Sequence, residues 1–499
     1  MMRLPSPGTA AWLLLAIALL PFALCSPLPL GDYINHLARM HIIAELPTNE
    51  LLKQYYEVHW AAIPNLAEDM LVPPLALLIG VERAQLLFTA SIFILIVTGV
   101  RALHRQLHGK SSWWPLVVFL LLYNRQFLWG FLNYLFAVGV MLWLLTFWLK
   151  AREQLRPATA VLFAIPTTLL FFCHLHPLAA FGLCVVSIEI NRWHAGQSLR
   201  TLMLALLQFV PGALLMLFAS PTSGRAGDIA FGSISNKVSG LLDAFNNYNL
   251  PLDAVTGALF FGALGLGVLT GRMRIHKDLR LAVVALLVCY AIVPNVLFSS
   301  FGADRRILIA TLIILVAALS TAPAIPRKYL MAVAGVALAL FGVRLGVIAT
   351  NWSAAQQVYE RLDAGFEPIT KGSRVACLVG EPLEPFLRNP PLDHFCNLAV
   401  IKRQVFTNAL FAEPGKQILR TRYNEDTPFN RSESQEYRFS GNSSQVGAIK
   451  DVITRLPLDR FDWVLIYHDR YFGDPRPPEL IRAWRDEAED ASLYQVRKP

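Results

Sequence analysis

A polar cluster follows the first apolar segment of the chain, in the string Gly-Asp-Tyr-Ile-Asn-His-Leu-Ala-Arg at residues 31–39. If this string is helical, Asp32, His36 and Arg39 follow an i, i+4, i+7 spacing and share one face. A carboxylate, a titratable ring and a cation then converge. Such a set can take a proton from a hydroxyl group and hold an anionic leaving group, so we interpret it as a candidate reaction site.

Further polar side chains fall near the expected outward ends of the apolar segments. An ionisable group at membrane depth costs about 2.5–3.5 kcal/mol on insertion scales, so each one needs a compensating role. A helical bundle can gather such groups around one cavity, where arginine and histidine donate hydrogen bonds to a phosphate. Besides the first cluster, the candidates are His41, Arg125, Asn133, His174, His176, Asp304, Arg305 and Arg306.

Several candidates also have a purely structural interpretation. Aspartate is common at helix starts, so Asp32 can be a helix cap, and Arg39 can pair with an acid only to stiffen the loop. His36 can be a neutral hydrogen-bonding side chain. Asn133, close to a glycine, can bridge two packed helices.

Metal and anion binding are left open by the remaining candidates. His174 and His176 lie two residues apart without a nearby third ligand, which is a weak metal signal, so a divalent ion stays an open alternative. Arg305 and Arg306 run against the tendency of cations to lie on the cytoplasmic side. An anion is therefore expected beside them, either a substrate phosphate or a lipid headgroup.

The composition places these residues in a membrane protein. Of 499 residues, 55% are hydrophobic and only 16% are charged, which is too apolar for a soluble chain of this length. The net charge of +9 is explained by cations in the cytoplasmic loops and does not indicate nucleic-acid binding. We therefore expect a mostly α, polytopic helical membrane protein.

About eleven apolar runs are long enough to be considered as spans of about 30 Å of hydrocarbon. The first run can instead be a cleaved signal peptide, although the residues after it match a cleavage site poorly. The runs lie at roughly 9–25, 84–100, 112–123, 130–149, 157–173, 177–190, 200–219, 251–270, 279–298, 306–322 and 329–349.

Lysine and arginine are concentrated in alternate short loops, which predicts that those loops are cytoplasmic. The acidic first loop, residues 26–82, is then extracytoplasmic and is expected to form short helices on the membrane surface. A second outward loop, at roughly 220–250, can act as a substrate gate or be an ordinary connector.

Beyond residue 350 the composition changes, which predicts a separate extracytoplasmic α/β domain over 351–499, after a membrane domain over 1–350. Strands are expected at 374–379, 463–467 and 492–496, and helices near 353–364 and 478–486. Cys377 and Cys396 can form a disulfide or stay free. Asp393 with His394, and the segment 467–469, are expected on ordinary surface loops.

The architecture resembles the GT-C superfamily of membrane glycosyltransferases. The resemblance rests on an acid directly after the first span, surface helices in the first loop, about a dozen spans and a soluble outer domain. The strings Asp-Tyr-Ile-Asn-His-Leu-Ala-Arg from Asp32 and Gly-Phe-Leu-Asn-Tyr from Gly130 are also similar to uncharacterised bacterial proteins of this kind. The first-loop acid of that superfamily is often one of a pair, whereas Asp32 has no acidic neighbour before Glu45.

The resemblance implies transfer of a sugar from a polyprenyl-phosphate donor to a hydroxyl group of a glycan or lipid acceptor, outside the cytoplasm and with inversion. Asp32 would be the catalytic base. His36, Arg39, Arg125, Arg305 and Arg306 would bind the donor phosphate, and Asn133, His174, His176 and Asp304 would support them. The expected location is the bacterial inner membrane.

Two other functions remain open for the same residues. A transporter or flippase would move a lipid-linked glycan through the same cationic cavity, although inverted repeats and broken helices are not evident in the sequence. A ligase or polymerase for preassembled glycans would depend more on histidine or arginine than on Asp32. The outer domain is assigned to acceptor recognition or to shaping the site.

Overall fold

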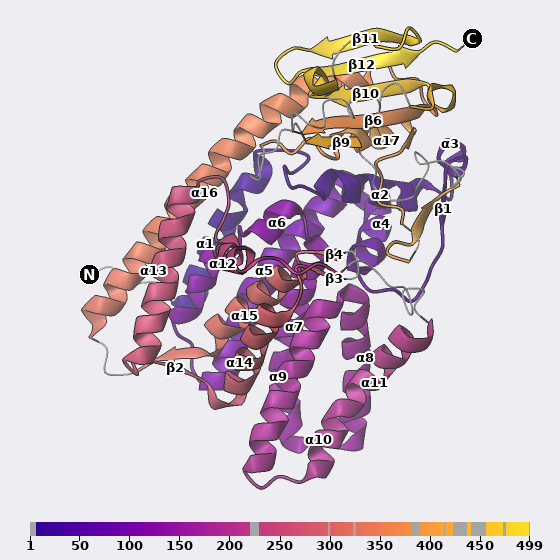
Figure 1. Cartoon of the computed structure of the whole chain (residues 1–499). Coiled ribbons are helices and arrows are strands. Elements are labelled where there is room, and N and C mark those ends of the chain that lie inside the picture. The colour runs from indigo at the N-terminus through magenta and orange to yellow at the C-terminus, as the bar shows by residue number, and fades with distance from the viewer. Residues whose placement is uncertain are drawn as a thin grey trace. The chain divides into compact units, whose positions relative to one another are not determined.

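The computed structural model describes residues 6–219, 229–297, 300–322, 326–381, 389–413, 415–422, 437–440, 456–472 and 476–498. The chain forms two compact units, each of which is described by itself (Figure 1). Unit 1 comprises Met1–Pro21, Ala62–Ala67 and Leu87–Ala349, and unit 2 comprises Phe22–Ala61, Glu68–Leu86 and Thr350–Pro499. The last boundary falls one residue from the predicted division at 351. Unit 2 also contains two N-terminal segments that the sequence pattern assigns to the membrane part.

Unit 1 is helical. Its α-helices are α1 (Pro7–Leu19), α6 (Arg125–Trp129), α7 (Leu132–Ala151), α8 (Pro157–Cys173), α9 (Leu175–His194), α10 (Leu199–Leu206), α11 (Val210–Leu214), α12 (Ile234–Asp243), α13 (Leu250–Leu269), α14 (Lys277–Ile292) and α15 (Ala303–Ala318). Helices α5 (Val81–His108) and α16 (Arg327–Asp363) contribute residues to both units, as does the short η1 (Leu20–Ala23).

Short irregular elements connect the helices of unit 1. They are the 3₁₀ helices η2 (Trp114–Leu121), η3 (Arg152–Gln154) and η4 (Leu207–Phe209), the π-helix η5 (Leu215–Ala219), and two antiparallel strand pairs, β2 (Met273–Ile275) with β5 (Leu319–Thr321) and β3 (Val296–Leu297) with β4 (Ser300–Phe301).

Five helices among the described residues are long and apolar enough to cross a membrane: Val81–His108, Leu132–Gln154, Leu199–Phe218, Leu250–Leu269 and Tyr329–Phe366. Two shorter apolar helices cover Pro7–Ala23 and Pro157–Cys173. The run predicted at 112–123 forms the 3₁₀ helix η2, which at about 2 Å per residue is too short to cross about 30 Å of hydrocarbon. The total of eleven spans stays a prediction.

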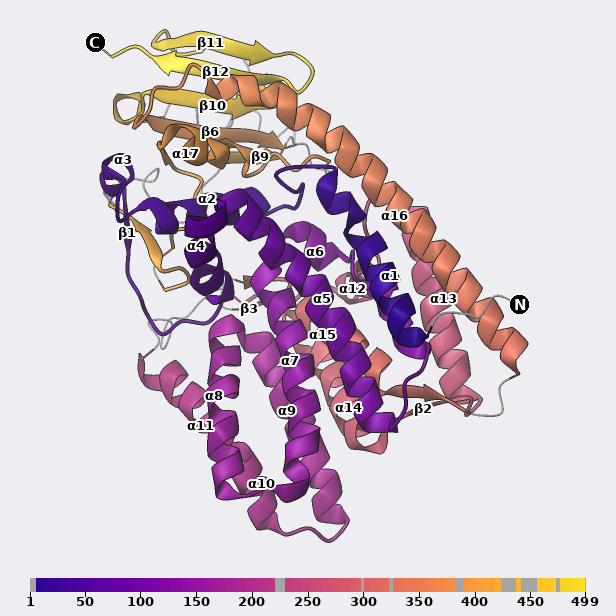
Figure 2. The same ribbon diagram turned by 180° about the vertical axis from the view of Figure 1, so that it is seen from behind.

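Helices α5 and α7 pack closely because glycine removes the side chain at their contact (Figure 2). A Cβ atom added at Gly139 of α7 would lie 2.5 Å from the Cβ of Leu95, and one added at Gly99 of α5 would lie 2.8 Å from the Cβ of Leu142. Small residues allow such an approach where apolar burial alone does not drive helices together in lipid.

Unit 2 combines a mixed sheet with short helices. Its helices are α2 (Tyr33–Glu45), α3 (Glu50–Lys53), α4 (Ala67–Ile79, with Ala67 in unit 1), α17 (Leu398–Arg403), η6 (Ala364–Phe366), η7 (Phe395–Asn397), η8 (Leu458–Arg460) and η9 (Asp469–Phe472). Its strands are β1 (Tyr56–Val58), β6 (Arg374–Glu381), β7 (Phe406–Thr407), β8 (Leu419–Thr421), β9 (Tyr437–Ser440), β10 (Trp463–Tyr467), β11 (Leu480–Asp486) and β12 (Ala491–Val496).

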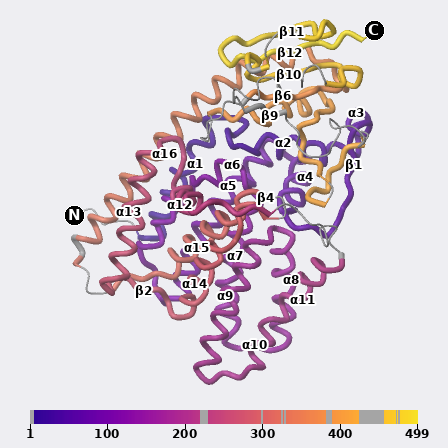
Figure 3. The backbone as a smooth tube through the Cα atoms, in the orientation of Figure 1, coloured from indigo at the N-terminus to yellow at the C-terminus, as the bar shows by residue number. Residues whose placement is uncertain are grey.

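The main sheet has the order β11-β12-β10-β6-β7, with β9 also paired to β6. Strands β7, β9 and β10 run parallel to β6, whereas β11 and β12 form an antiparallel edge. All five residues of β10 are buried, as expected for an apolar run in a central strand. A separate antiparallel pair joins β1 to β8, so an early and a late segment of the chain lie side by side within unit 2 (Figure 3).

The three strands predicted in this region are confirmed as β6, β10 and β12, and the helix predicted near 353–364 is confirmed as the end of α16. The helix predicted at 478–486 is wrong, because this segment forms strand β11 and pairs with β12. Its exposed Arg482 and Arg485 suit an edge strand, where charge opposes pairing with another chain.

Candidate functional site

Helix α2 displays the polar string on two faces. Asp32 occupies its N-cap position, but its side chain makes no capping hydrogen bond within the described residues. The Asp32 carboxylate is 29% exposed and faces His394, with 3.5 Å between Oδ1 and the ring Nε2. The capping interpretation of Asp32 therefore does not describe this structure, and the carboxylate stays accessible to a reactant.

Asn35, one turn along α2 from Asp32, is fixed by three hydrogen bonds. Its Nδ2 donates to the carbonyl of Ala409 at 2.8 Å and lies 3.1 Å from Nδ1 of His394. Its Oδ1 accepts from the backbone N–H of Phe411 at 2.8 Å. The surface-loop interpretation of His394 is wrong, because the residue is only 4% exposed and is held against α2.

The other polar face of α2 meets two adjacent acids of α4. The Arg39 guanidinium lies 3.0 Å from Oδ2 of Asp69 and 3.6 Å from Oε2 of Glu68, and Arg39 is 1% exposed. The Nδ1 of His36 lies 2.6 Å from Oε2 of Glu68, and Gln85 donates to the same carboxylate. These contacts form a buried cluster of two carboxylates, one guanidinium and one imidazole.

The two acids of this cluster respond differently to their surroundings. Burial raises the pKa of Asp69, and although Arg39 opposes this effect the pKa stays above its ordinary value. Burial also acts to raise the pKa of Glu68, but the charge and hydrogen bond of His36, the charge of Arg39 and the hydrogen bond of Gln85 outweigh it and lower that pKa. Glu68 is therefore the acid that holds its negative charge most firmly.

Unit 1 carries a separate group of guanidinium side chains. Arg125 of α6 and Arg305 of α15 share the carboxylate of Asp243, with Nε to oxygen distances of 3.7 and 3.1 Å. Both guanidinium groups stack on Trp129, at 5.6 and 5.5 Å from its ring centre, and Arg305 also lies over Phe301. The pKa of Asp243 is raised by its burial, against the attraction of Arg305 and Arg125.

This arrangement leaves positive charge available for an anion. Two guanidinium groups share one carboxylate, and both present their Nε atoms to it. Within the described part of the chain, the Nε atoms of Arg125 and Arg305 are buried and make no hydrogen bond, so their contact with Asp243 is one of charge. A guanidinium fork in this state matches two oxygen atoms of a phosphate.

Arg306 and Asp304, the neighbours of Arg305, make different contacts. Arg306 donates to the carbonyl of Phe301 at 2.7 Å and lies 4.1 Å from the ring centre of Phe131. Asp304 accepts from Lys237 at 2.8 Å and from Asn295 at 3.1 Å. Asp304 thus holds α12 against the start of α15, which is a supporting role.

Asn133, His174 and His176 also lie in unit 1. The side chain of Asn133 donates to the carbonyl of Asn65 at 3.2 Å, so it connects α7 to the segment 62–67. The ring of His174 accepts from the backbone N–H of His176 at 3.2 Å, and burial lowers the pKa of both histidines. Within the described residues, no group of three or more potential ligands is arranged for a metal ion.

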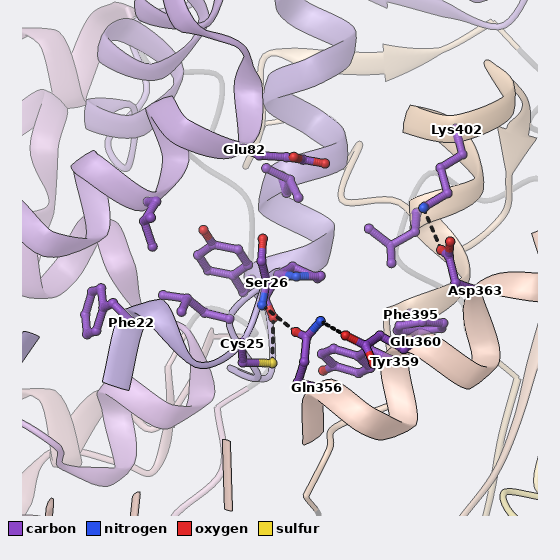
Figure 4. Close-up of a pocket in the computed structure, with 16 residues that line it drawn as sticks. Phe22, Cys25, Ser26, Glu82, Gln356, Tyr359, Glu360, Asp363, Phe395 and Lys402 are labelled. Atoms are coloured by element: carbon purple, nitrogen blue, oxygen red, sulfur yellow. Dashed lines mark hydrogen bonds and ion pairs between the residues drawn. The ribbon is translucent and has the colours of Figure 1, made fainter. Parts of the chain in front are cut away.

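Unit 2 also contains a cavity of about 280 Å³ (Figure 4). Its wall includes Tyr359 and Phe395, whose rings stack at 4.8 Å, and its rim carries Lys402 paired with Asp363 at 2.6 Å. Asp32 does not line this cavity. We therefore assign it no part in the chemistry of the carboxylate.

The predicted site residues thus fall into two groups, each inside one unit. Unit 2 holds Asp32, His36, Arg39 and His41, and unit 1 holds the other predicted members of the site. The shared face predicted for α2 is divided, since Asp32 faces His394 while His36 and Arg39 face the acids of α4. The convergence of all these residues on one cavity stays a prediction.

Five residues of these groups were missed by reasoning from sequence. They are Glu68, Asp69, Gln85, His394 and Asp243. A buried arginine needs a counter-charge, so the adjacent acids of the first loop were the available signal for the Arg39 cluster. No local signal marks Asp243, which is the last residue of helix α12 in a region that the sequence predicts as a loop.

Comparison with known proteins agrees with this architecture. The chain is similar to the crystal structure of ArnT from Cupriavidus metallidurans bound to undecaprenyl phosphate, with a TM-score of 0.52 and 11% sequence identity over 98% of this chain and 97% of that chain. No protein-family model and no curated protein matches the sequence. The likeness shows the fold alone, so this chain has an ArnT-like, mostly helical polytopic fold, as the sequence predicts.

Proposed function

We propose that this protein is a membrane glycosyltransferase that moves a sugar from a polyprenyl-phosphate donor to a hydroxyl acceptor. The observation that carries the proposal is the accessible carboxylate of Asp32, which makes no capping hydrogen bond to α2 within the described residues. It lies in a chain whose fold is similar to that of ArnT bound to undecaprenyl phosphate. A bacterial inner membrane supplies donors of this kind, and the bridged pair Cys377–Cys396 fits an oxidising compartment for unit 2.

We assign the donor phosphate to the arginine pair of unit 1. The forks of Arg125 and Arg305 are oriented by Asp243 and by stacking on Trp129, so their hydrogen bonds form with little loss of side-chain freedom. The leaving phosphate gains negative charge as its bond to the sugar breaks. Fixed guanidinium groups stabilise that charge more in the transition state than in the bound donor.

We assign the acceptor proton to Asp32. The acceptor oxygen attacks the anomeric carbon, the bond from that carbon to the phosphate oxygen breaks, and the hydroxyl proton passes to the carboxylate. The products are the glycosylated acceptor and polyprenyl phosphate, and the anomeric configuration is inverted. A positioned base contributes typically about 10²- to 10⁴-fold to such a step.

Arg39 and His36 receive a structural role in this proposal rather than the donor-binding role expected from sequence. The guanidinium of Arg39 already contacts two buried carboxylates, and His36 contacts one of them at 2.6 Å. Recruiting either side chain to a phosphate would leave Asp69 or Glu68 buried without its partner, which is costly.

The test uses the full chain in proteoliposomes with labelled polyprenyl-phosphate sugars and a mixture of hydroxylated acceptors. D32N should fold normally and lose about 10²- to 10⁴-fold in kcat, because Asn accepts no proton. R305M should mainly raise the concentration of donor needed for half-maximal rate. Sugar that crosses the membrane without covalent transfer would identify a transporter instead, and full activity of D32N would remove the base assignment.

A further inference from the structure

We propose that His394 is a positioning residue for Asp32 and that Asn35 fixes the proton of its ring on Nε2. The role for Asp32 rests on the proposed function, but the position of the ring proton does not. By this inference, a residue from the C-terminal part of the chain contacts the reacting carboxylate and orients it. It starts from an amide whose orientation is determined by backbone groups on both of its atoms.

The side-chain amide of Asn35 can point in only one direction. Its Oδ1 lies 2.8 Å from the backbone N–H of Phe411, which can only donate, and its Nδ2 lies 2.8 Å from the carbonyl of Ala409, which can only accept. Exchanging oxygen and nitrogen would set donor against donor and acceptor against acceptor. The Nδ2 group is therefore the atom that faces His394.

That orientation decides the tautomer of the imidazole. Asn35 Nδ2 lies 3.1 Å from Nδ1 of His394 and brings a hydrogen atom to it, so Nδ1 must be the unprotonated, accepting nitrogen. The ring proton then lies on Nε2, which is 3.5 Å from Oδ1 of Asp32. Catalytic hydrogen bonds in unliganded proteins are often this long and shorten when substrate binds.

The ring itself is held in place by its surroundings. His394 is 4% exposed and meets the ring of Phe411 edge-on at 5.0 Å between centres. Two residues along the chain, Cys396 is bridged to Cys377 of strand β6. The imidazole can therefore neither rotate freely nor leave, and its Nε2 stays 3.5 Å from Oδ1 of Asp32.

A fixed donor at one oxygen of Asp32 leaves the other oxygen for the acceptor hydroxyl. Within the described residues, the only contact of the carboxylate that the structure shows is at Oδ1. The ring cannot itself take the proton that Asp32 receives, because Nε2 already carries one and Nδ1 is occupied by Asn35. His394 therefore orients the base and does not relay the proton.

The first experiment determines directly which ring nitrogen of His394 carries the proton. The full chain is labelled with ¹⁵N-histidine, and the signals of His394 are identified as those lost in H394Q. We expect the ¹⁵N shifts to show a protonated Nε2 and an unprotonated Nδ1 in the wild-type protein. A proton on Nδ1, or on both nitrogens, at neutral pH overturns the inference whatever the activity of the enzyme.

A variant of Asn35 provides a second arm of the same measurement. N35D keeps an acceptor for the N–H of Phe411 but replaces the donor at Nδ1 by a carboxylate oxygen, which should draw the ring proton to Nδ1. Unchanged histidine shifts in folded N35D would contradict the role of Asn35. If N35D does not fold, the wild-type spectrum alone decides the tautomer.

Kinetics then test the positioning role. H394F keeps a buried ring without a donor and should lower kcat about 10- to 100-fold, with the donor KM changed less than about twofold. H394Q restores an N–H donor and should recover most of the rate. H59Q is the matched control, because His59 is an exposed histidine of the same unit, and it should keep the wild-type rate.

The outcomes separate this inference from the proposed function. Full activity of H394F, or equal loss in H394F and H394Q, contradicts positioning through the Nε2–H group. Full activity of D32N contradicts the proposed base, while the ring proton on Nε2 would still stand. Loss of activity in D32N together with wild-type kinetics in H394F removes His394 and keeps Asp32.

Discussion

Replacing Arg39 by methionine separates the two interpretations of this residue. If Arg39 binds donor phosphate, R39M should keep the stability of unit 2 and lose affinity for the donor. If Arg39 balances buried carboxylates, R39M should destabilise helix α2 and the segments packed on it. Methionine occupies much of the space of the arginine stem, so the change is mainly one of charge and hydrogen bonding.

The geometry predicts a large loss of stability. The Arg39 guanidinium is buried and lies 3.0 Å from Asp69, which is 2% exposed, so its removal leaves an acid without its main partner. Breaking one side of a buried ion pair costs about 3–5 kcal/mol. Removing both charges in R39M/D69L should cost much less, because the remaining Glu68 keeps His36 and Gln85.

Hydrogen exchange of the backbone amides of α2, followed by mass spectrometry in nanodiscs, measures this loss as a free energy of opening. A cost of about 3–5 kcal/mol corresponds to exchange roughly 2 × 10²- to 5 × 10³-fold faster in R39M. K53M is the control, since Lys53 and Glu50 form an exposed pair at 2.7 Å worth at most about 1 kcal/mol. Unchanged exchange in R39M together with a raised donor KM would refute the structural role.

Two further predictions concern packing and the disulfide. G139A should lower the stability of unit 1 by about 1–3 kcal/mol, because its Cβ would lie 2.5 Å from that of Leu95. G262A is the control, since an added Cβ at Gly262 meets open space. Thermal unfolding in detergent compares the two variants, and equal midpoints would contradict the close α5–α7 contact. C377S/C396S should lower the stability of unit 2 by about 3 kcal/mol, because it removes a cross-link between residues 19 positions apart. C289S is the control, since Cys289 is a free thiol. Unaltered hydrogen exchange of the β6 amides in the double variant would contradict this prediction.

The helices and strands of this protein are largely predictable because their apolar patterns are local. The long membrane helices follow from uninterrupted apolar runs, and β10 follows from five consecutive apolar or aromatic residues. Strand β11 was mistaken for a helix because its apolar residues Leu480, Ile481 and Trp484 also fit a helical spacing. The segment forms a strand because it pairs with β12, which lies outside the stretch whose apolar spacing predicts a helix.

The site is predictable only in part, for a related reason. The string after Asp32 predicts the helix and a candidate acid at its start, but the partners of that helix lie far along the chain. Asn35 contacts Ala409 across 374 positions, and no spacing rule reaches that distance. Likewise the sequence predicts Arg305 as an outward cation, whereas its partner Asp243 lies in a region without a periodic pattern.

The pairing of early and late segments in unit 2 also affects how the protein is made. Asn35 emerges from the ribosome 374 residues before Ala409, which at about 5–20 residues per second is an interval of roughly 20–75 s. Throughout that time the amide of Asn35 and strand β1 lack the backbone partners that they have in the finished protein. Newly made chains therefore pass through an incomplete state in which these polar groups bind water or a chaperone until residues 409 and 419–421 have been synthesised.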